Sequence, residues 1–311
     1  MNFRTPHSAF FLPLLISFAG CNAPEAFHRA QTAFSKGATL ENQEHFADVA
    51  NQLPNNFIYF DDLYQPVTPV APEHSADDYY EDAMGAIKTA LKNKRQLKKI
   101  AVLDNAYAIQ ALSMWRLERY EEAQAVARQA VPLLEKTEND EIDTRDLAMM
   151  RALPGLINVD LSVEALQQIQ ALAESLAGSE EEAERKAIYQ QIKSLFTQYF
   201  LSDTDGAPSV NRSLAIIEQS IDKQGRGGAI SLYLRNVQLA GINNWGDAFQ
   251  MVFLSARRLN DSSEESLWIL EVREEYKSIV RKHLKLLENA LPKGRDNKLY
   301  QYWVQLLSRG V

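Results

Sequence analysis

Few residues in this sequence have the types and spacing that chemistry requires. The chain has a single cysteine, Cys21, so only one thiol could act as a nucleophile or accept a lipid. The five histidines are scattered along the chain: His7, His28, His45, His74 and His283. None has a second histidine three or four residues away, the spacing that places two zinc ligands on one face of a helix. The sequence therefore predicts no metal site and no bound cofactor.

Two short motifs match signatures of enzymes that act on the bacterial cell wall. Ser220-Ile221-Asp222-Lys223 matches S-x-x-K, which pairs a serine nucleophile with a lysine in penicillin-binding proteins, but no K-T-G strand follows. Glu174-Ser175 matches the Glu-Ser pair of lytic transglycosylases, without the downstream segment of that family. A glycosidase needs an acid of raised pKa in a defined cleft. A peptidoglycan-acting enzyme that uses a carboxylate of the helical body is therefore the alternative hypothesis, and no catalytic residue is assigned.

Cys21 ends a segment that is typical of export signals. Arg4 makes the first residues positively charged, and the apolar run Ala9–Ala19 has the length of a signal-peptide core. A transmembrane helix needs about 20 apolar residues, so this run is too short for a permanent span. The small residues Ala19 and Gly20 come directly before the cysteine, where an extended backbone could enter a peptidase groove.

The segment from Phe18 to Cys21 resembles the lipobox of bacterial lipoproteins, although that family prefers leucine at the position of Phe18. The resemblance implies cleavage between Gly20 and Cys21, acylation of the Cys21 sulfur, and membrane attachment through the lipid. Asn22, in place of the aspartate that marks inner-membrane retention in enterobacteria, implies the periplasmic face of the outer membrane. The inner membrane, or release into the periplasm after an ordinary cut near Ala19, stays open.

The charge of the chain excludes some partners. The full chain has a net charge of −8, and loss of Arg4 with the signal would change this to −9. An acidic body is repelled by nucleic-acid phosphates and by anionic lipid headgroups. We therefore expect no nucleic-acid partner, and we expect membrane contact through the lipid alone. With Cys21 acylated, no thiol would remain to form a disulfide.

The elements that would position these residues are helices. Apolar residues recur at helical spacing, and no alternating run of strand length stands out. The predicted fold class is all-α, with antiparallel helical hairpins in an irregular array or α-solenoid. The predicted segments are a cleaved signal at 1–20, a helical segment at 21–65, a proline-rich linker at 66–74, a helical domain at 75–201 that Ser75 would cap, a loop at 202–209, and a second helical domain at 210–311.

Glycine and proline mark several helix ends that the sequence predicts. Gly37 is expected to end a first short helix, and Pro154-Gly155 to interrupt a longer one. Gly241 is expected to end the first helix of a hairpin, whose second helix would be Trp245–Leu259. These positions divide the predicted helices into short units joined by turns.

The segment 104–136 resembles a tetratricopeptide repeat. The matching residues are Tyr107, Ala111, Met114, Tyr120, Ala123, Ala127 and Ala130. In that family, small residues at the positions of Ala111, Ala123 and Ala130 let two antiparallel helices approach closely. A second partial match has Trp245 where the first has Tyr120, an offset of 125 residues that is not a multiple of the repeat length of about 34. Any antiparallel helix pair with an alanine seam would explain the same pattern.

The repeat-like pattern implies a binding surface. If the hairpin belongs to a concave array, Tyr79, Tyr107, Trp115 and Tyr120 would line its groove, although aromatic residues also belong to cores. The preferred hypothesis is a membrane-anchored helical scaffold that binds an envelope protein or peptide and is not an enzyme. The enzyme hypothesis predicts instead a closed cleft that holds a buried acid of strongly raised pKa.

Overall fold

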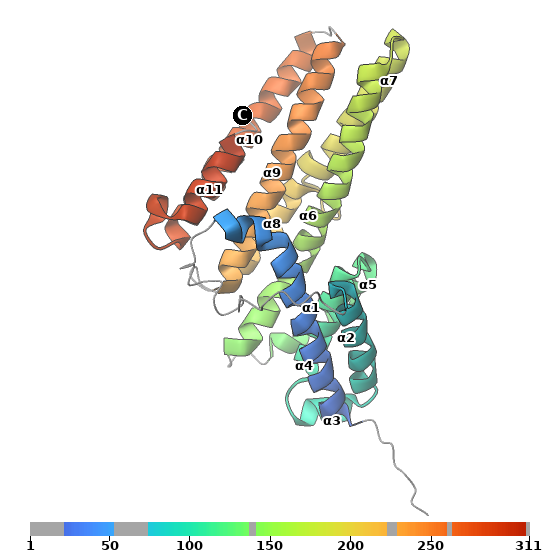
Figure 1. The fold of residues 1–311 in the computed structure, drawn as a ribbon, viewed down its shortest axis with the longest axis vertical. Helices are drawn as coiled ribbons and strands as arrows, with labels where there is room; N and C mark the ends of the chain where they lie inside the picture. The colour runs from blue at the N-terminus through green and yellow to red at the C-terminus, as the bar shows by residue number, and fades with distance from the viewer. Residues whose placement is uncertain (1–21, 53–73, 137–140, 223–228, 260–262, 309–311) are drawn as a thin grey trace, which may run out of the picture.

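The computed structural model describes residues 22–52, 74–136, 141–222, 229–259 and 263–308. Within these ranges the chain forms eleven α-helices and no strand, which confirms the predicted all-α class (Figure 1). The signal segment, Cys21 and the prolines of the predicted linker lie outside the described residues.

Five helices form the N-terminal part of the body. They are α1 (Ala23–Gln52), α2 (Ala76–Leu91), α3 (Lys94–Lys99), α4 (Leu103–Arg116) and α5 (Tyr120–Leu134). Ser75 begins α2 with a capping box: its hydroxyl accepts the N–H of Asp78, and the Asp78 carboxylate accepts the N–H of Ser75. The predicted cap is therefore confirmed. Because α1 packs along α2 and also contacts α4, the first helix is part of the same packed body.

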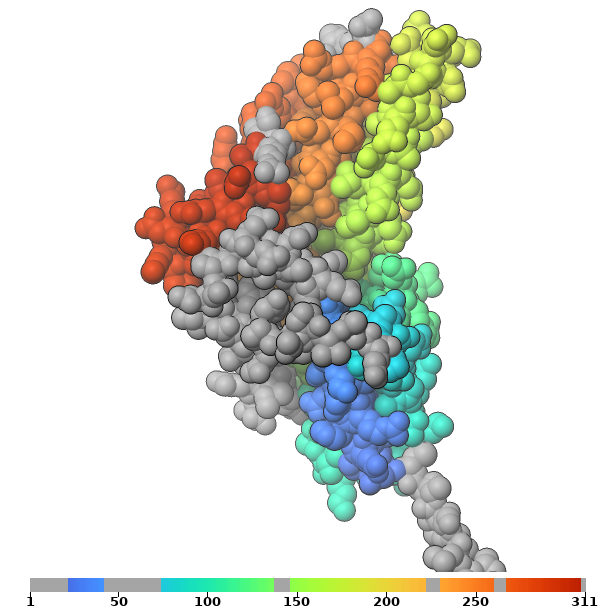
Figure 2. Space-filling model, in the orientation of Figure 1, coloured from blue at the N-terminus to red at the C-terminus, as the bar shows by residue number. Residues whose placement is uncertain are grey.

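The rest of the chain surrounds one long helix. Its elements are α6 (Glu141–Gly178), α7 (Glu182–Phe196), the π-helical turn η1 (Thr197–Leu201), α8 (Val210–Asp222), α9 (Ala229–Arg258), α10 (Ser263–Ala290), the 3₁₀ turn η2 (Gly294–Asp296) and α11 (Lys298–Leu307). Helix α6 contacts α4, α5, α7, α8 and α9. The body is elongated, with α1–α5 gathered at one end and the tips of the α6–α7 and α9–α10 hairpins at the other (Figures 1 and 2).

The buried apolar residues form two clusters, and α6 contributes to both. The first cluster includes Trp115 and Leu153 and is built mainly from α1 to α6. The second includes Ile169, Trp245 and Tyr276 and is built from α6 to α11. Since Leu153 and Ile169 belong to the same helix, a continuous backbone links the two clusters.

The segment 104–136 folds as the predicted helical hairpin. Helices α4 and α5 are joined by the turn Leu117–Arg119, in which Glu118 has a φ of 58°. This left-handed conformation costs glutamate more than it would cost glycine. The three alanines of the predicted seam are fully buried: Ala111, Ala123 and Ala130.

Three helix ends predicted from glycine and proline are wrong. Helix α1 continues through Gly37, α6 continues through Pro154 and Gly155, and α9 continues through Gly241. The second hairpin expected at Gly241 is therefore one continuous helix of 30 residues.

The three glycines lie where helices cross closely. A Cβ added at each would contact a neighbouring side chain: Tyr80 at 3.0 Å from Gly37, Ile217 at 2.9 Å from Gly155 and Val159 at 3.2 Å from Gly241. Contacts this short leave no room for a side chain, so glycine serves close packing between helices at these positions. The sequence alone does not distinguish a glycine that allows close helix packing from a glycine that ends a helix.

Candidate functional site

The four aromatic residues predicted to line a groove lie in different surroundings. Tyr107 and Trp115 belong to the first core cluster, where they are 8% and 4% exposed. Tyr79 and Tyr120 are partly exposed, on α2 and α5. The ring of Tyr79 contacts that of His74 edge-on, with 5.6 Å between the centroids. Only Tyr79 and Tyr120 therefore keep appreciable surface for a partner.

Trp115 belongs to a polar network that joins four helices. Its indole Nε1 donates a hydrogen bond to the Asp160 carboxylate of α6 at 2.6 Å, and the Arg116 guanidinium lies 3.8 Å from the ring centroid. Arg116 donates to Glu41 of α1 at 2.8 Å and to the Tyr233 hydroxyl of α9 at 3.1 Å. We call these five residues, together with Tyr80 of α2, the Arg116 cluster.

In the Arg116 cluster, the surroundings favour the protonated forms of Tyr80 and Arg116. The Tyr80 hydroxyl donates to Glu41 at 2.5 Å, and burial together with the Glu41 charge raises the pKa of Tyr80 above its usual value. Burial is also the main cause that raises the pKa of the adjoining Tyr120 to about 12. Burial alone would lower the pKa of Arg116, but Tyr233 and Glu41 raise it. A general acid or base needs a pKa near the working pH, and the raised pKa values of Tyr80 and Arg116 lie far from it. These two groups are therefore suited to joining helices.

A second buried network connects α8 and α9, and the buried His283 of α10 lies in its electrostatic field. Arg235 donates from both terminal nitrogens to Glu218, at 3.0 and 3.3 Å, and Gln238 donates to the same carboxylate at 3.2 Å. Burial acts to raise the pKa of Glu218, but the hydrogen bonds from Arg235 and Gln238 hold it below its usual value. His283 of α10 is buried, and its Nδ1–H donates to the Ile279 carbonyl at 3.0 Å. Burial is the main cause that lowers the pKa of His283.

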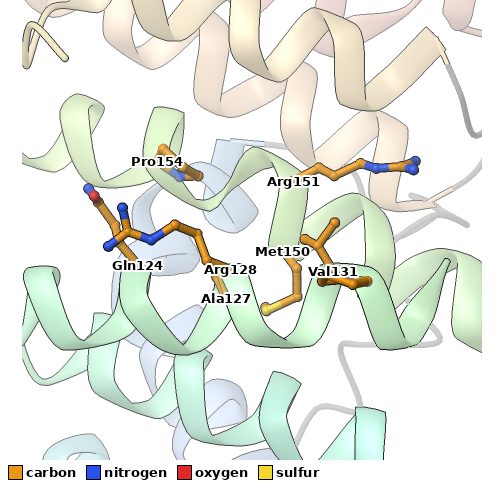
Figure 3. Close-up of a pocket in the computed structure, with 8 residues that line it drawn as sticks. Gln124, Ala127, Arg128, Val131, Met150, Arg151 and Pro154 are labelled. Atoms are coloured by element: carbon orange, nitrogen blue, oxygen red, sulfur yellow. The ribbon is translucent and has the colours of Figure 1, made fainter. Parts of the chain in front are cut away.

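A groove opens between α5 and α6 (Figure 3). Its volume is about 290 Å³, just below the roughly 300–1,000 Å³ that ligand pockets occupy. Its apolar lining consists of Ala127, Val131, Pro132, Met150 and Pro154. Its polar lining consists of Gln124, Arg128 and Arg151. The groove is therefore an apolar strip with nitrogen donors beside it, large enough for one or two apolar side chains.

The polar side chains lie at opposite ends of the groove. Gln124 and Arg128 are one helical turn apart on α5 and lie together at one end, while Arg151 of α6 lies at the other (Figure 3). Arg151 donates to Glu135 at 2.8 Å. Arg128 is exposed and forms no hydrogen bond or ion pair within the described residues. Its guanidinium is thus available to a ligand.

Two prolines inside helices alter the backbone beside the groove. Pro132 lies within α5 and Pro154 within α6. Proline has no N–H, so the carbonyls four residues earlier, those of Arg128 and Met150, lack their regular helical donors. All four residues line the groove. The groove therefore combines an apolar strip with the exposed Arg128, which has no partner among the described residues.

Among the described residues, Ser220 and Glu174 of the cell-wall enzyme motifs are hydrogen-bonded within their own helices. The Ser220 hydroxyl donates to the Ile216 carbonyl of its own helix, and Lys223 lies outside the described residues. Glu174 is exposed on α6 and accepts a hydrogen bond from Gln170. No group of three or more His, Cys, Asp or Glu residues that could hold a metal occurs in the described part of the chain.

No helix among the described residues is long and apolar enough to cross a membrane.

Comparisons of the chain with protein-family models, with curated proteins and with solved structures find no match. A function for this protein must therefore be argued from its own residues.

Proposed function

We propose that the protein is a lipid-anchored lipoprotein of the bacterial cell envelope that acts as a helical scaffold and binds a protein or peptide segment. The lipobox-like residues before Cys21 support the anchor, and Asn22 favours the periplasmic face of the outer membrane. Helix α1 begins at Ala23, so only one residue would separate an acylated Cys21 from the body.

The position of this anchor would orient the molecule. The start of α1 lies near α3, at the end of the body opposite the tip of the α9–α10 hairpin (Figure 1). A lipid at Cys21 would therefore hold the α1–α5 end near the membrane and direct the α9–α10 tip away from it. The acidic charge of the chain, −8, would add little attraction to anionic headgroups.

The observation that most supports a binding function is the α5–α6 groove. It is an apolar strip with Arg128, which has no partner among the described residues, at one end, and apolar surface with a few polar groups is typical of binding sites. The buried networks around Arg116 and Arg235 instead have their charges paired inside the protein. We therefore place the partner at the α5–α6 groove.

The anchor is tested by Cys21→Ser. The wild-type chain should fractionate with membranes and incorporate a labelled fatty acid, whereas the variant should lose the label and move to the soluble fraction. Unchanged membrane partition of Cys21→Ser would refute the lipid anchor. Separation of the two membranes on a density gradient would test the outer-membrane assignment.

The groove is tested by crosslinking in cells. A photoreactive residue is placed at Gln124, which lines the groove, and as a matched control at Gln168, which is exposed on α6 and does not line it. We expect discrete protein adducts from position 124 and none of the same mass from position 168. Adducts that are identical at the two positions, or absent from both, would refute a partner at this groove.

A further inference from the structure

We propose that the α5–α6 groove binds an extended peptide segment in which apolar side chains are flanked by acidic residues. This inference rests on the proposed binding function and adds the chemistry of the partner. Three features of the groove lead to it: the apolar strip, the positions of the two arginines, and the two carbonyls that lack helical donors.

The apolar strip sets the middle of the bound segment. Ala127 and Val131 of α5 face Met150 of α6 across the groove, and Pro132 and Pro154 complete the lining. The space of about 290 Å³ accommodates one or two side chains of the size of leucine or valine. Ala127 and Met150 are 2% and 1% exposed and belong to the core. A ligand would therefore meet mainly Val131, Pro132 and Pro154, which keep exposed surface.

The arginines set the charge of the segment on either side of its apolar centre. Arg128 has no partner among the described residues, and a carboxylate could accept both of its terminal N–H groups, with Gln124 as a further donor. At the other end, Arg151 pairs with Glu135, whose side chain is 46% exposed. The Arg151 side chain is 18% exposed, so the pair is partly open to solvent and a ligand carboxylate could displace Glu135 from it. Two cations on a chain of net charge −8 favour an acidic partner at this place.

The prolines favour an extended segment over a helical one. The carbonyls of Arg128 and Met150 have no regular helical donor, because Pro132 and Pro154 lack N–H groups. An extended peptide has unpaired backbone N–H groups to offer, whereas a helical ligand has already used most of its own. An extended segment could therefore offer N–H groups to these two carbonyls while its acidic side chains pair with the arginines.

The test measures binding of two synthetic probes to the purified full chain by fluorescence anisotropy. The acidic probe is the labelled, amidated peptide Gly-Ser-Asp-Leu-Val-Glu-Ser-Gly, and the neutral probe has Asn and Gln in place of Asp and Glu. The variant Arg128→Gln removes the free cation. The matched control is Arg95→Gln, which removes an exposed arginine of α3 outside the groove.

We expect the acidic probe to bind at least tenfold more tightly than the neutral probe. Arg128→Gln should weaken its binding by about tenfold, as for loss of one charge-assisted contact, whereas Arg95→Gln should leave it unchanged. Added salt should weaken the acidic probe selectively.

Equal binding of the two probes, equal effects of the two variants, or no binding of either probe would overturn this inference. Crosslinking from position 124 reports separately on the proposed function. A partner captured there together with equal binding of the probes would show that the groove binds a protein by another chemistry. Thermal unfolding of each variant, monitored by circular dichroism, establishes that lost binding is not lost folding.

Discussion

Replacing Gly246 by alanine should destabilise the protein, although alanine is the better helix former. Gly246 lies inside α9 and faces Tyr276 of α10. A Cβ added at Gly246 would lie 2.5 Å from the Tyr276 Oη and 2.9 Å from Cζ. Both distances are shorter than carbon atoms tolerate from non-bonded neighbours, so the Tyr276 side chain or one of the two helices would have to shift.

The magnitude follows from two opposing terms. In an open helix, glycine to alanine gains about 1 kcal/mol of stability. Tyr276 has little room to retreat, because it is 1% exposed and contacts Trp245 edge-on with 6.0 Å between ring centroids. Overpacking of a tight core costs about 1–3 kcal/mol, and a contact this short belongs at the upper end of that range. We expect a net loss of about 1–2 kcal/mol for Gly246→Ala.

Urea unfolding followed by circular dichroism measures this change. The matched control is Gly85→Ala in α2, where an added Cβ has no neighbour within 4 Å, and here a gain of about 0.5–1 kcal/mol is expected. Combining Gly246→Ala with Tyr276→Phe removes the 2.5 Å contact and should recover part of the loss. If Gly246→Ala stabilises the protein as much as Gly85→Ala does, the close approach of α9 and α10 described above is refuted.

Three further predictions concern the buried polar groups. Arg235→Met should cost about 3–5 kcal/mol in urea unfolding, because it leaves the half-buried Glu218 carboxylate without its main donor, and the double variant with Glu218→Gln should recover part of this cost. Burial lowers the pKa of His283 in the folded state, so the unfolded state takes up the proton first. Stability should therefore fall as pH decreases from about 6.5, and urea midpoints of His283→Gln should lose this part of the pH dependence while the wild type keeps it. Trp115→Phe should cost about 1–3 kcal/mol, because Asp160 loses the donor at 2.6 Å, and a melting temperature equal to that of the wild type would show that this hydrogen bond contributes nothing.

Local patterns predicted a large part of the fold. Apolar spacing along each segment reflects the face that a helix buries, and this is why the all-α class is confirmed. The cap at Ser75 depends on a residue three positions away, and the hairpin at 104–136 depends on neighbouring helices joined by a short turn. Features that depend on residues close together in the sequence are visible in it.

The candidate site was not predictable in the same way. Gln124 and Arg128 come from one helix and Met150 and Arg151 from another, and nothing in their local sequence shows that they face each other. Trp115 and Tyr107 had the right residue type and helical position for a groove, but long-range packing placed them in the core. Pro132 and Pro154 were the sequence signal for this site, because a proline inside a helix removes a backbone hydrogen bond and needs compensation from its surroundings.

The sequence by itself determined that the chain is helical, which surfaces are apolar, and that a lipobox-like segment precedes a single cysteine. Only the tertiary structure decided what Gly37, Gly155 and Gly241 do. A glycine at each of these positions predicts a helix end from the sequence, yet each lies inside a helix against a neighbouring side chain. The absence of a Cβ allows two outcomes, a turn or a close crossing, and the choice depends on whether another helix can pack there. That choice depends on contacts between distant segments, and it produced the long helices α1, α6 and α9, of which α6 forms one side of the α5–α6 groove.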